Sequence, residues 1–303
     1  MKIVSKAPLR ISLFGGGTDY PLWYSKNNGQ VIGFSINRYC SWACSDSCSE
    51  LDREYVKKLE QFTGVPSLNE NLKSCTDHFI QKGLGASSAL ANSLLMYLYK
   101  KNNLLKTQYD IALNSINFEQ DFLKMHVGSQ DQVLTAMGGI NHVKFSAKEI
   151  ECEPLKLSSE FIDEFENSLI LVEMGKRLTS SDVAKKYINV ENKNFSVLDE
   201  MTDLVNEGKK LFENKECISS IGKLLNDSWD LKKDLISDDF CTSVDEYLKS
   251  FRRKGILGGK LLGAGEGGYL LMLVPAKLQD TLDFSGKNIV SNLKIDFKGA
   301  HLV

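Results

Sequence analysis

Several features that would assign this chain to a broad class of protein are absent. Its 303 residues carry a formal net charge of −2, so charge gives no reason to expect nucleic acid or an anionic membrane as a partner. No apolar run approaches the length of a bilayer span, and the basic start Met1–Lys6 lacks the apolar segment of a signal peptide. The seven cysteines are scattered, and the one close pair, Cys44 and Cys48, has no second pair or nearby histidine to complete a zinc site. We therefore expect a cytoplasmic protein with reduced thiols.

The composition is that of a globular protein with mixed secondary structure. Hydrophobic residues make up 42% of the chain, which argues against extensive disorder, and there is no internal repeat. The spacing of apolar residues predicts strands over 9–14, 31–39, 140–145, 168–173 and 269–274, and helices over 49–62, 87–101, 107–125, 180–191, 195–213, 216–229 and 240–253. Two such mixed blocks predict an α+β protein with two domains, 1–152 and 153–303.

Glycine clusters stand at three junctions of the predicted elements: Gly15–Gly17, Gly83–Gly85 and Gly263–Gly268. The second cluster leads through Ser87 and Ser88 into an apolar helix. Its backbone N–H groups and the helix dipole would suit an anion, and the two hydroxyls could cap the helix or bind a metal ion. The cluster is not a Walker loop, because the Gly-Lys-Ser/Thr ending is missing. An ordinary glycine turn before a helix explains it equally well, but three such clusters exceed what turns usually require.

Glu119 is an acidic residue on an apolar helix face. The helix predicted over 107–125 begins at Thr107, with Asp110 placed to complete a capping box. Helical spacing puts Glu119 on the same seam as Ile116. A carboxylate on such a seam needs a cationic partner. Either a buried salt bridge or a metal ion bound to a triphosphate would supply it.

Asp131 and Arg10 are two further candidates for chemistry. Asp131 lies in Gly128–Gln132, where an Asp beside a glycine is most often a turn or cap residue. Its distance of twelve residues from Glu119 would let a helix and a loop bring both carboxylates to one site. Arg10 faces away from the aliphatic residues of its strand and is available for an ion pair or for phosphate.

Three motifs, in order, resemble the GHMP small-molecule kinases, the family of galactokinase, homoserine kinase, mevalonate kinase and phosphomevalonate kinase. They are Pro8–Tyr20, Gly83–Leu90 and Leu262–Tyr269. The Gly-Gly-Gly-Thr-Asp form of the first is similar to the branch of D-glycero-D-manno-heptose 7-phosphate kinases and fucokinase-type enzymes. That branch also resembles this chain at Gly128–Gln132 and at Gly175–Ser181. The matches extend from residue 6 to about residue 274 and so cover most of the chain.

This resemblance implies a two-domain α+β fold with a ferredoxin-like C-terminal domain, and an ATP- and Mg²⁺-dependent sugar kinase. The expected reaction phosphorylates the anomeric hydroxyl of D-glycero-D-manno-heptose 7-phosphate, giving the 1,7-bisphosphate. One alternative is a kinase of a free hexose of the fucose or galactose type. Another is a catalytically silent sugar and ATP sensor, which the presence of Asp131 and Arg10 disfavours. An isoprenoid-pathway kinase explains Asp19 less well.

The resemblance also assigns roles to residues. Asp131 matches the catalytic base, and Arg10 matches the basic residue that holds this Asp ionised. Ser88 and Glu119 match the magnesium ligands. The residues that match the loop around the ATP phosphates are Gly83, Leu84, Gly85, Ala86, Ser87 and Ser88. The residues expected on the substrate side are Gly16, Gly17, Thr18, Asp19, Arg177, Gly265 and Gly267.

Two features depart from the family pattern. Glu266 stands where the family usually has glycine, and its carboxylate must point away from phosphate. The segment 41–76 is shorter than is usual in the heptose-kinase branch. Because that region helps to build the base side of the nucleotide cleft, the preference for a nucleotide base stays open, as does the oligomeric state.

Overall fold

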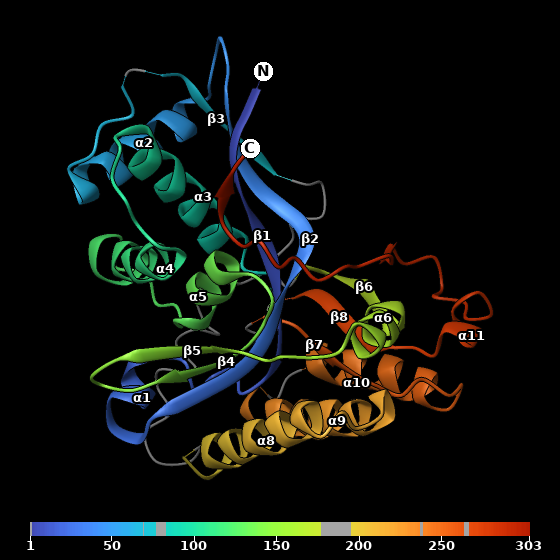
Figure 1. Cartoon of the computed structure of the whole chain (residues 1–303). Helices are drawn as coiled ribbons and strands as arrows, with labels where there is room; N and C mark the ends of the chain where they lie inside the picture. The colour runs from blue at the N-terminus through green and yellow to red at the C-terminus, as the bar shows by residue number, and fades with distance from the viewer. Residues whose placement is uncertain (1, 69, 77–82, 177–194, 237–238, 264–266) are drawn as a thin grey trace.

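The structure of the chain is a computed structural model that describes residues 2–68, 70–76, 83–176, 195–236, 239–263 and 267–303. Two β-sheets, each covered by helices, form the molecule (Figure 1). This arrangement confirms the predicted α+β class. No helix within the described ranges is long and apolar enough to cross a bilayer.

The first sheet is antiparallel and has the strand order β10-β1-β2-β4-β5, with β3 also paired to β2. Its strands are β1 (Lys2–Phe14), β2 (Gly29–Cys44), β3 (Leu72–Thr76), β4 (Ile140–Phe145), β5 (Ile150–Pro154) and β10 (His301–Leu302). The expected strands at 9–14 and 31–39 are therefore the inner parts of two longer strands. The boundary expected near residue 152 falls within β5 and stays a prediction.

Helices cover both faces of this sheet. On β2, Gly33 lies against Leu134 of α5, whereas the side chain of Gln30 bonds to the carbonyl of Thr202 in α8. Residues of odd and even number on a strand point to opposite faces, so α5 and α8 lie on opposite sides. The helices around this sheet are α1 (Pro21–Asn27), α2 (Glu50–Thr63), α3 (Ala86–Lys101), α4 (Gln108–Asn117), α5 (Gln130–Met137) and α8 (Phe195–Glu213).

The central helix α3 is apolar around most of its circumference. Its residues from Ala91 to Tyr99 are all buried, which is the pattern of a helix inside a core rather than on a surface. It packs on both β1 and β2. This packing places its N-terminus, the second glycine cluster, beside the middle of β1.

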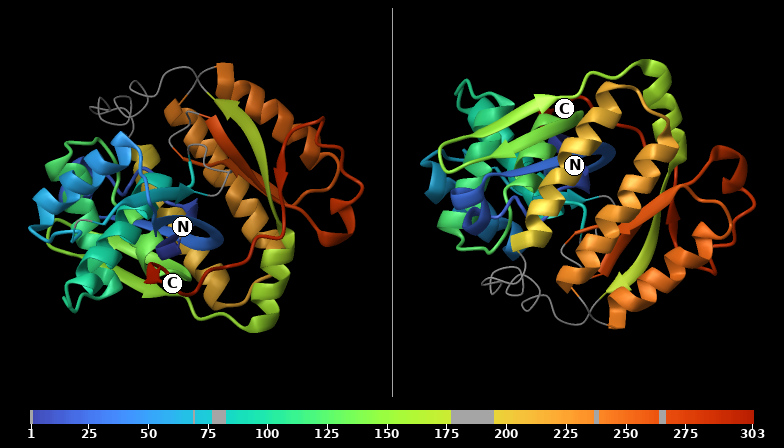
Figure 2. Two further views of the ribbon diagram at one scale, coloured as in Figure 1. Left: turned by 90° about the horizontal axis from the view of Figure 1, so that it is seen from above. Right: turned by 90° about the horizontal axis from the view of Figure 1, so that it is seen from below.

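The second sheet is also antiparallel, in the order β7-β8-β6-β9. Its elements are α6 (Ser159–Ser168), β6 (Leu169–Lys176), α9 (Ile218–Ile236), α10 (Asp239–Arg252), β7 (Gly258–Leu261), β8 (Gly267–Leu273), α11 (Ala276–Gln279) and β9 (Ile289–Val290). Seen from below, α8 and α9 lie side by side, α8 on the first sheet and α9 on the second (Figure 2). This helix pair joins the two halves.

Local signals set several element ends. The capping box of Thr107 and Asp110 is confirmed at the start of α4. The single helix expected over 107–125 is wrong, because α4 ends at Asn117 and a π-helix, η1 (Phe118–Phe122), follows. The helix expected over 180–191 lies outside the described residues.

Candidate active site

Arg10 and Asp131 form an ion pair at the centre of the candidate site. The Nε and Nη2 atoms of Arg10 lie 2.8 and 2.7 Å from Oδ1 of Asp131. The arginine side chain is 4% exposed and the aspartate side chain 30% exposed. The buried guanidinium of Arg10 therefore binds a carboxylate, that of Asp131, which solvent can reach. Strand β1 supplies the arginine and the first turn of α5 supplies the aspartate.

Arg10 also holds the start of the second glycine cluster. Its Nη1 donates to the carbonyl of Gly83 at 2.6 Å, and its backbone N–H donates to the carbonyl of Leu84 at 2.9 Å. Gly85 has φ +73°, and a Cβ there would lie 2.9 Å from Cγ of Arg10. Only glycine fits this position without displacing the arginine.

Helix α3 begins immediately after Gly85. Its N-cap residue, Gly85, makes no side-chain cap, so N–H groups of the first turn have no such partner among the described residues. Ser87 and Ser88 do not cap the helix, which corrects one of the two roles open to them in the sequence. Their hydroxyls instead donate to Glu119. The helix end with its positive dipole is suited to an anion.

Glu119 is a buried carboxylate, 1% exposed, with neutral partners. Ser87 Oγ donates to Oε1 at 2.6 Å, and Ser88 Oγ donates to Oε2 at 2.7 Å. Gln132 Nε2 also donates to Oε2. Burial raises the pKa of Glu119, the three hydrogen bonds oppose this, and the charge of Asp131 raises it further. None of these described partners is a cation. The buried salt bridge that the sequence offered as one explanation of Glu119 is therefore not formed with them.

The π-helix sets where Glu119 points. Residues 118–122 make a wider turn than an α-helix, and such turns often occur at functional sites. Phe118, immediately before Glu119, is fully buried and packs against aromatic rings of α2. This packing holds the backbone next to Glu119 in place.

Asp19 is the third carboxylate of the candidate site and, like Glu119, is 1% exposed. Its Oδ1 accepts the N–H of Gly17 at 3.0 Å and its Oδ2 accepts that of Gln130 at 3.2 Å. Burial raises the pKa of Asp19, the backbone hydrogen bond from Gly17 lowers it, and the charge of Asp131 raises it. Asp19 therefore lies against the segment that leads into Asp131.

Thr18 and Gly16, two neighbours of Asp19 in the first motif, contact different parts of the structure. Thr18 is fully buried, and its Oγ1 donates to the carbonyls of Gly15 and Gln30 at 2.8 and 2.9 Å. Gly16 lies near Ser12 and Gln130, which a Cβ would approach to 3.3 and 3.6 Å. The hydroxyl of Thr18 thus ties the motif to β2.

The third glycine motif meets the second. Gly263 has φ +73°, and a Cβ on it would lie 2.5 Å from the Cα of Gly83. Gly267 begins β8. Arg177, Gly265 and Glu266 lie outside the described residues. The two backbone turns are therefore in direct contact, with one coming from each half of the molecule.

Three residues near this site were not singled out from the sequence. Gln132 contacts Glu119 and lies in the polar segment that drew attention to Asp131. Two buried lysines, Lys232 and Lys260, lie on the C-terminal side. Lys260 could have been noticed in the sequence, because a lysine within an apolar segment just before the third motif is unusual. Nothing in the sequence distinguishes Lys232 from the adjacent Lys233.

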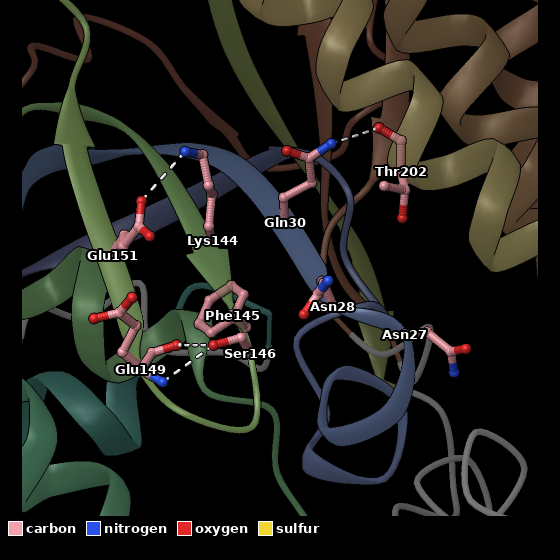
Figure 3. Close-up of a pocket in the computed structure, with 10 residues that line it drawn as sticks. Asn27, Asn28, Gln30, Lys144, Phe145, Ser146, Glu149, Glu151 and Thr202 are labelled. Atoms are coloured by element: carbon pink, nitrogen blue, oxygen red, sulfur yellow. Dashed lines mark hydrogen bonds and ion pairs between the residues drawn. The ribbon is translucent and has the colours of Figure 1, made fainter.

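A pocket of about 450 Å³ lies away from this constellation. It opens between the β4–β5 hairpin and the start of α8, and Gln30 reaches across it to Thr202 (Figure 3). Lys144 and Glu151 pair at 3.2 Å on its other side. Arg10, Glu119 and Asp131 do not line it.

Comparison with known proteins identifies the family of the chain. The GHMP kinases N-terminal domain model matches residues 54–139, and the GHMP kinases C-terminal model matches residues 209–284. A D-glycero-alpha-D-manno-heptose 7-phosphate kinase of Campylobacter jejuni is 25% identical over 90% of this chain and 89% of its own. A galactokinase of Thermotoga neapolitana is 24% identical over 88% of each chain.

Solved structures show the same fold. A D-glycero-D-manno-heptose 1-phosphate kinase from Bacteroides thetaiotaomicron superimposes with a TM-score of 0.79 at 19% identity, covering 99% of this chain and 98% of its own. The chain therefore belongs to the GHMP kinase family. Like the members of that family, it is an ATP-dependent kinase of a small molecule.

Proposed function

We propose that this protein is a sugar kinase that transfers the γ-phosphoryl group of ATP to the anomeric hydroxyl of D-glycero-D-manno-heptose 7-phosphate, giving the 1,7-bisphosphate and ADP. The observation that carries the proposal is the contact of Arg10 with both Asp131 and Gly83. It joins a solvent-accessible carboxylate to the loop proposed for the ATP phosphates. The similarity to a heptose 7-phosphate kinase over most of both chains supports the substrate.

Asp131 acts as the general base in this proposal. The sugar hydroxyl gives its proton to the carboxylate as its oxygen attacks the γ-phosphorus, and the bond to the β-phosphate oxygen breaks to release ADP. Arg10 orients the carboxylate through two nitrogens, and its positive charge stabilises the transferring phosphoryl group. Little covalent chemistry is needed, because phosphoryl transfer depends mainly on alignment and charge neutralisation.

The residues Gly83–Ser88 would hold the ATP phosphates. The helix dipole and the N–H groups at the start of α3 favour an anion there. Glu119 and Ser88 fit Mg²⁺, because a buried carboxylate and a hydroxyl in contact form a hard oxygen donor set. The ion would neutralise phosphate charge when bound. It would also relieve the cost of burying the charge of Glu119.

Asp19 is the residue proposed to hydrogen-bond sugar hydroxyls. Its carboxylate accepts the backbone N–H groups of Gly17 and Gln130, and an ionised carboxylate has about four lone-pair sites with which to accept hydrogen bonds. Gly16, Gly17 and Thr18 shape the turn that carries it. Arg177, outside the described residues, is the proposed contact for the phosphate of the sugar phosphate. A free-hexose 1-kinase is the second candidate, because a galactokinase is similar over 88% of both chains.

The test is ADP release by the purified protein with MgATP. D-glycero-D-manno-heptose 7-phosphate is compared with fucose, mannose and galactose, each at the same concentration. Turnover on the heptose phosphate alone supports the proposed substrate, and turnover on a free sugar alone selects the second candidate. ATP binding with no turnover on any of them overturns both proposed substrates and makes a sugar and ATP sensor as well supported as a kinase of these sugars.

A further inference from the structure

Lys232 is a buried amine close to the candidate site. It lies on α9 and is 6% exposed. Its Nζ donates to the carbonyl of Leu261 at 2.8 Å and to the carbonyl of Gly263. Burial lowers its pKa to about 7; Cys241 of α10 raises it, and Arg10 of β1 lowers it. A methionine would fill the same space without burying an amine, so the amine carries a cost that its contacts must justify.

Those contacts lead directly to the catalytic pair. Lys232 holds Gly263, and Gly263 packs against the backbone of Gly83. The carbonyl of Gly83 in turn accepts the Nη1 hydrogen bond of Arg10, which binds Asp131. Each link is a direct hydrogen bond or backbone contact. A shift of the Gly263 turn would therefore be transmitted to the phosphate loop.

Lys260 makes a parallel connection from the next strand. It is 4% exposed, and its Nζ donates to the carbonyl of Leu13 at 2.7 Å and to Oγ of Ser228 at 3.2 Å. Leu13 lies three residues after Arg10 on β1. The described partners of both lysines are carbonyls and a hydroxyl. Two amines of the C-terminal half thus hold the strand and the loop that place Arg10.

The neighbouring Lys233 has different surroundings. Its Nζ pairs with Asp230 at 2.7 Å and with Asp245 at 3.0 Å, on the side of α9 that faces α10. Neither of these two partners belongs to a glycine turn. A substitution at Lys233 removes an amine from α9 but leaves Gly263 held, whereas a substitution at Lys232 also releases Gly263. Comparing the two variants therefore isolates the effect of releasing Gly263.

We propose that Lys232 is a positioning residue of the phosphate site, which holds the Gly263 turn against Gly83 so that the ATP phosphate loop and Arg10 keep their places. This inference rests on the proposed function only in taking Gly83–Ser88 as the phosphate loop. It assigns to the C-terminal half a direct part in shaping a site whose reacting groups all come from the N-terminal half.

The test measures binding of Mg²⁺ with a non-hydrolysable ATP analogue by calorimetry. We expect Lys232→Met to weaken this binding about tenfold or more, and the control Lys233→Met to stay within about twofold of the wild type. The KM for the sugar should stay within about twofold in both variants, which a general loosening of the fold would not allow. Lys232→Leu, which also removes the N–H donor, is read in place of Lys232→Met if the latter does not fold.

A second variant tests the route. Gly263→Ala should weaken binding of the analogue as well, because its Cβ would displace Gly83. The double variant should be no weaker than the worse single variant, since both act through the same turn. Additive losses, or wild-type affinity in both Lys232 variants, would overturn the inference. A wild-type protein that binds no analogue would instead count against the proposed phosphate loop.

Discussion

Gly128 lies directly against the carboxylate of Asp19. A Cβ at position 128 would stand 2.0 Å from Oδ2 of Asp19 and 2.6 Å from its Cγ. No side chain therefore fits at 128 while Asp19 keeps its position. The contact with Asp19 of the first motif, more than a hundred residues earlier in the chain, therefore requires glycine at the start of the segment Gly128–Gln132.

Gly128→Ala is expected to impair the sugar side of the site. The new methyl group must displace Asp19, so the KM for the sugar should rise about tenfold or more while MgATP affinity changes little. Steady-state kinetics and calorimetry measure the two effects. Gly64→Ala is the control, because Gly64 also resists substitution through its φ of +69° but has open space around it. Equal sugar KM values in the two variants would contradict the role of this contact.

Asp131→Asn is expected to lower kcat about a hundredfold or more, because the amide cannot accept the hydroxyl proton. MgATP binding and the unfolding midpoint should change little, since the side chain is 30% exposed and an amide oxygen can still accept from Arg10. Asp121→Asn is the matched control, because it removes the charge of an exposed aspartate in η1. Near-normal turnover in Asp131→Asn would remove this residue from the mechanism.

Glu119→Gln and Ser88→Ala are expected to shift the Mg²⁺ dependence. Glu119→Gln removes the negative charge of one proposed ligand and Ser88→Ala removes the oxygen of the other, so the Mg²⁺ concentration for half-maximal turnover should rise about tenfold. The measurement is a Mg²⁺ titration at fixed ATP. Ser93→Ala is the control, because Ser93 is a buried serine of the same helix whose hydroxyl donates to Leu90. An unchanged Mg²⁺ requirement in both variants would refute the assignment.

The pH dependence of nucleotide binding should report on Lys232. With a pKa of about 7, this amine is largely neutral at pH 8, and nearby phosphate charge favours its protonated form. Binding of the MgATP analogue should therefore take up protons at pH 8 and not at pH 5.5, where the amine is already charged. Calorimetry in buffers of different ionisation enthalpy measures the uptake. The other charged groups facing Lys232 in the described structure are Arg10 and Lys260, so uptake that persists in Lys232→Met would point to Lys260.

Asp245 is expected to stabilise the second half at neutral pH. Burial alone would raise its pKa, but hydrogen bonds from Lys249, Lys233 and Trp229 lower it to about 2. A carboxyl whose pKa falls on folding stabilises the fold above its unfolded pKa, and this contribution is lost as pH falls through the folded pKa. Asp245→Asn should thus cost about 2 kcal/mol at pH 7 by urea unfolding, and progressively less below about pH 4.

The control for that prediction is Asp230→Asn. Asp230 also pairs with Lys233, but its side chain is 55% exposed, and such surface pairs contribute little. An equal loss of unfolding free energy in both variants would show that the network around Trp229 adds nothing beyond a surface ion pair.

The sequence predicted the parts of the site that lie in compact motifs. Arg10 and Asp131 are 121 positions apart and meet, and Ser88 contacts Glu119 as the resemblance implied. Glu119 could be suspected from helical spacing alone, because a carboxylate on an apolar seam is rare enough to notice. The family was predicted from the resemblance of three motifs in order, and the α+β class from two blocks of mixed strands and helices.

Other features depend on packing that spacing does not encode. Lys232 and Lys233 are identical neighbours, yet one is buried under the Gly263 turn and the other pairs with two aspartates. Periodicity also could not show the π-helix, since one wide turn leaves the apolar pattern of the preceding helix intact. The strands β3 and β5 carry few buried residues, so alternation gave no signal for them.

The edge strand β10 has a consequence for the order of folding during synthesis. Leu302 pairs with Ser5, and Ala300 donates to the carbonyl of Ala136, so residues near 300 complete a sheet that begins near residue 5. This edge of β1 therefore stays uncovered until residue 302 has left the ribosome. The second sheet, whose strands all lie between 169 and 290, can close earlier. A stalled or truncated chain would leave the strand that carries Arg10 with an open edge, the kind of surface on which chains aggregate.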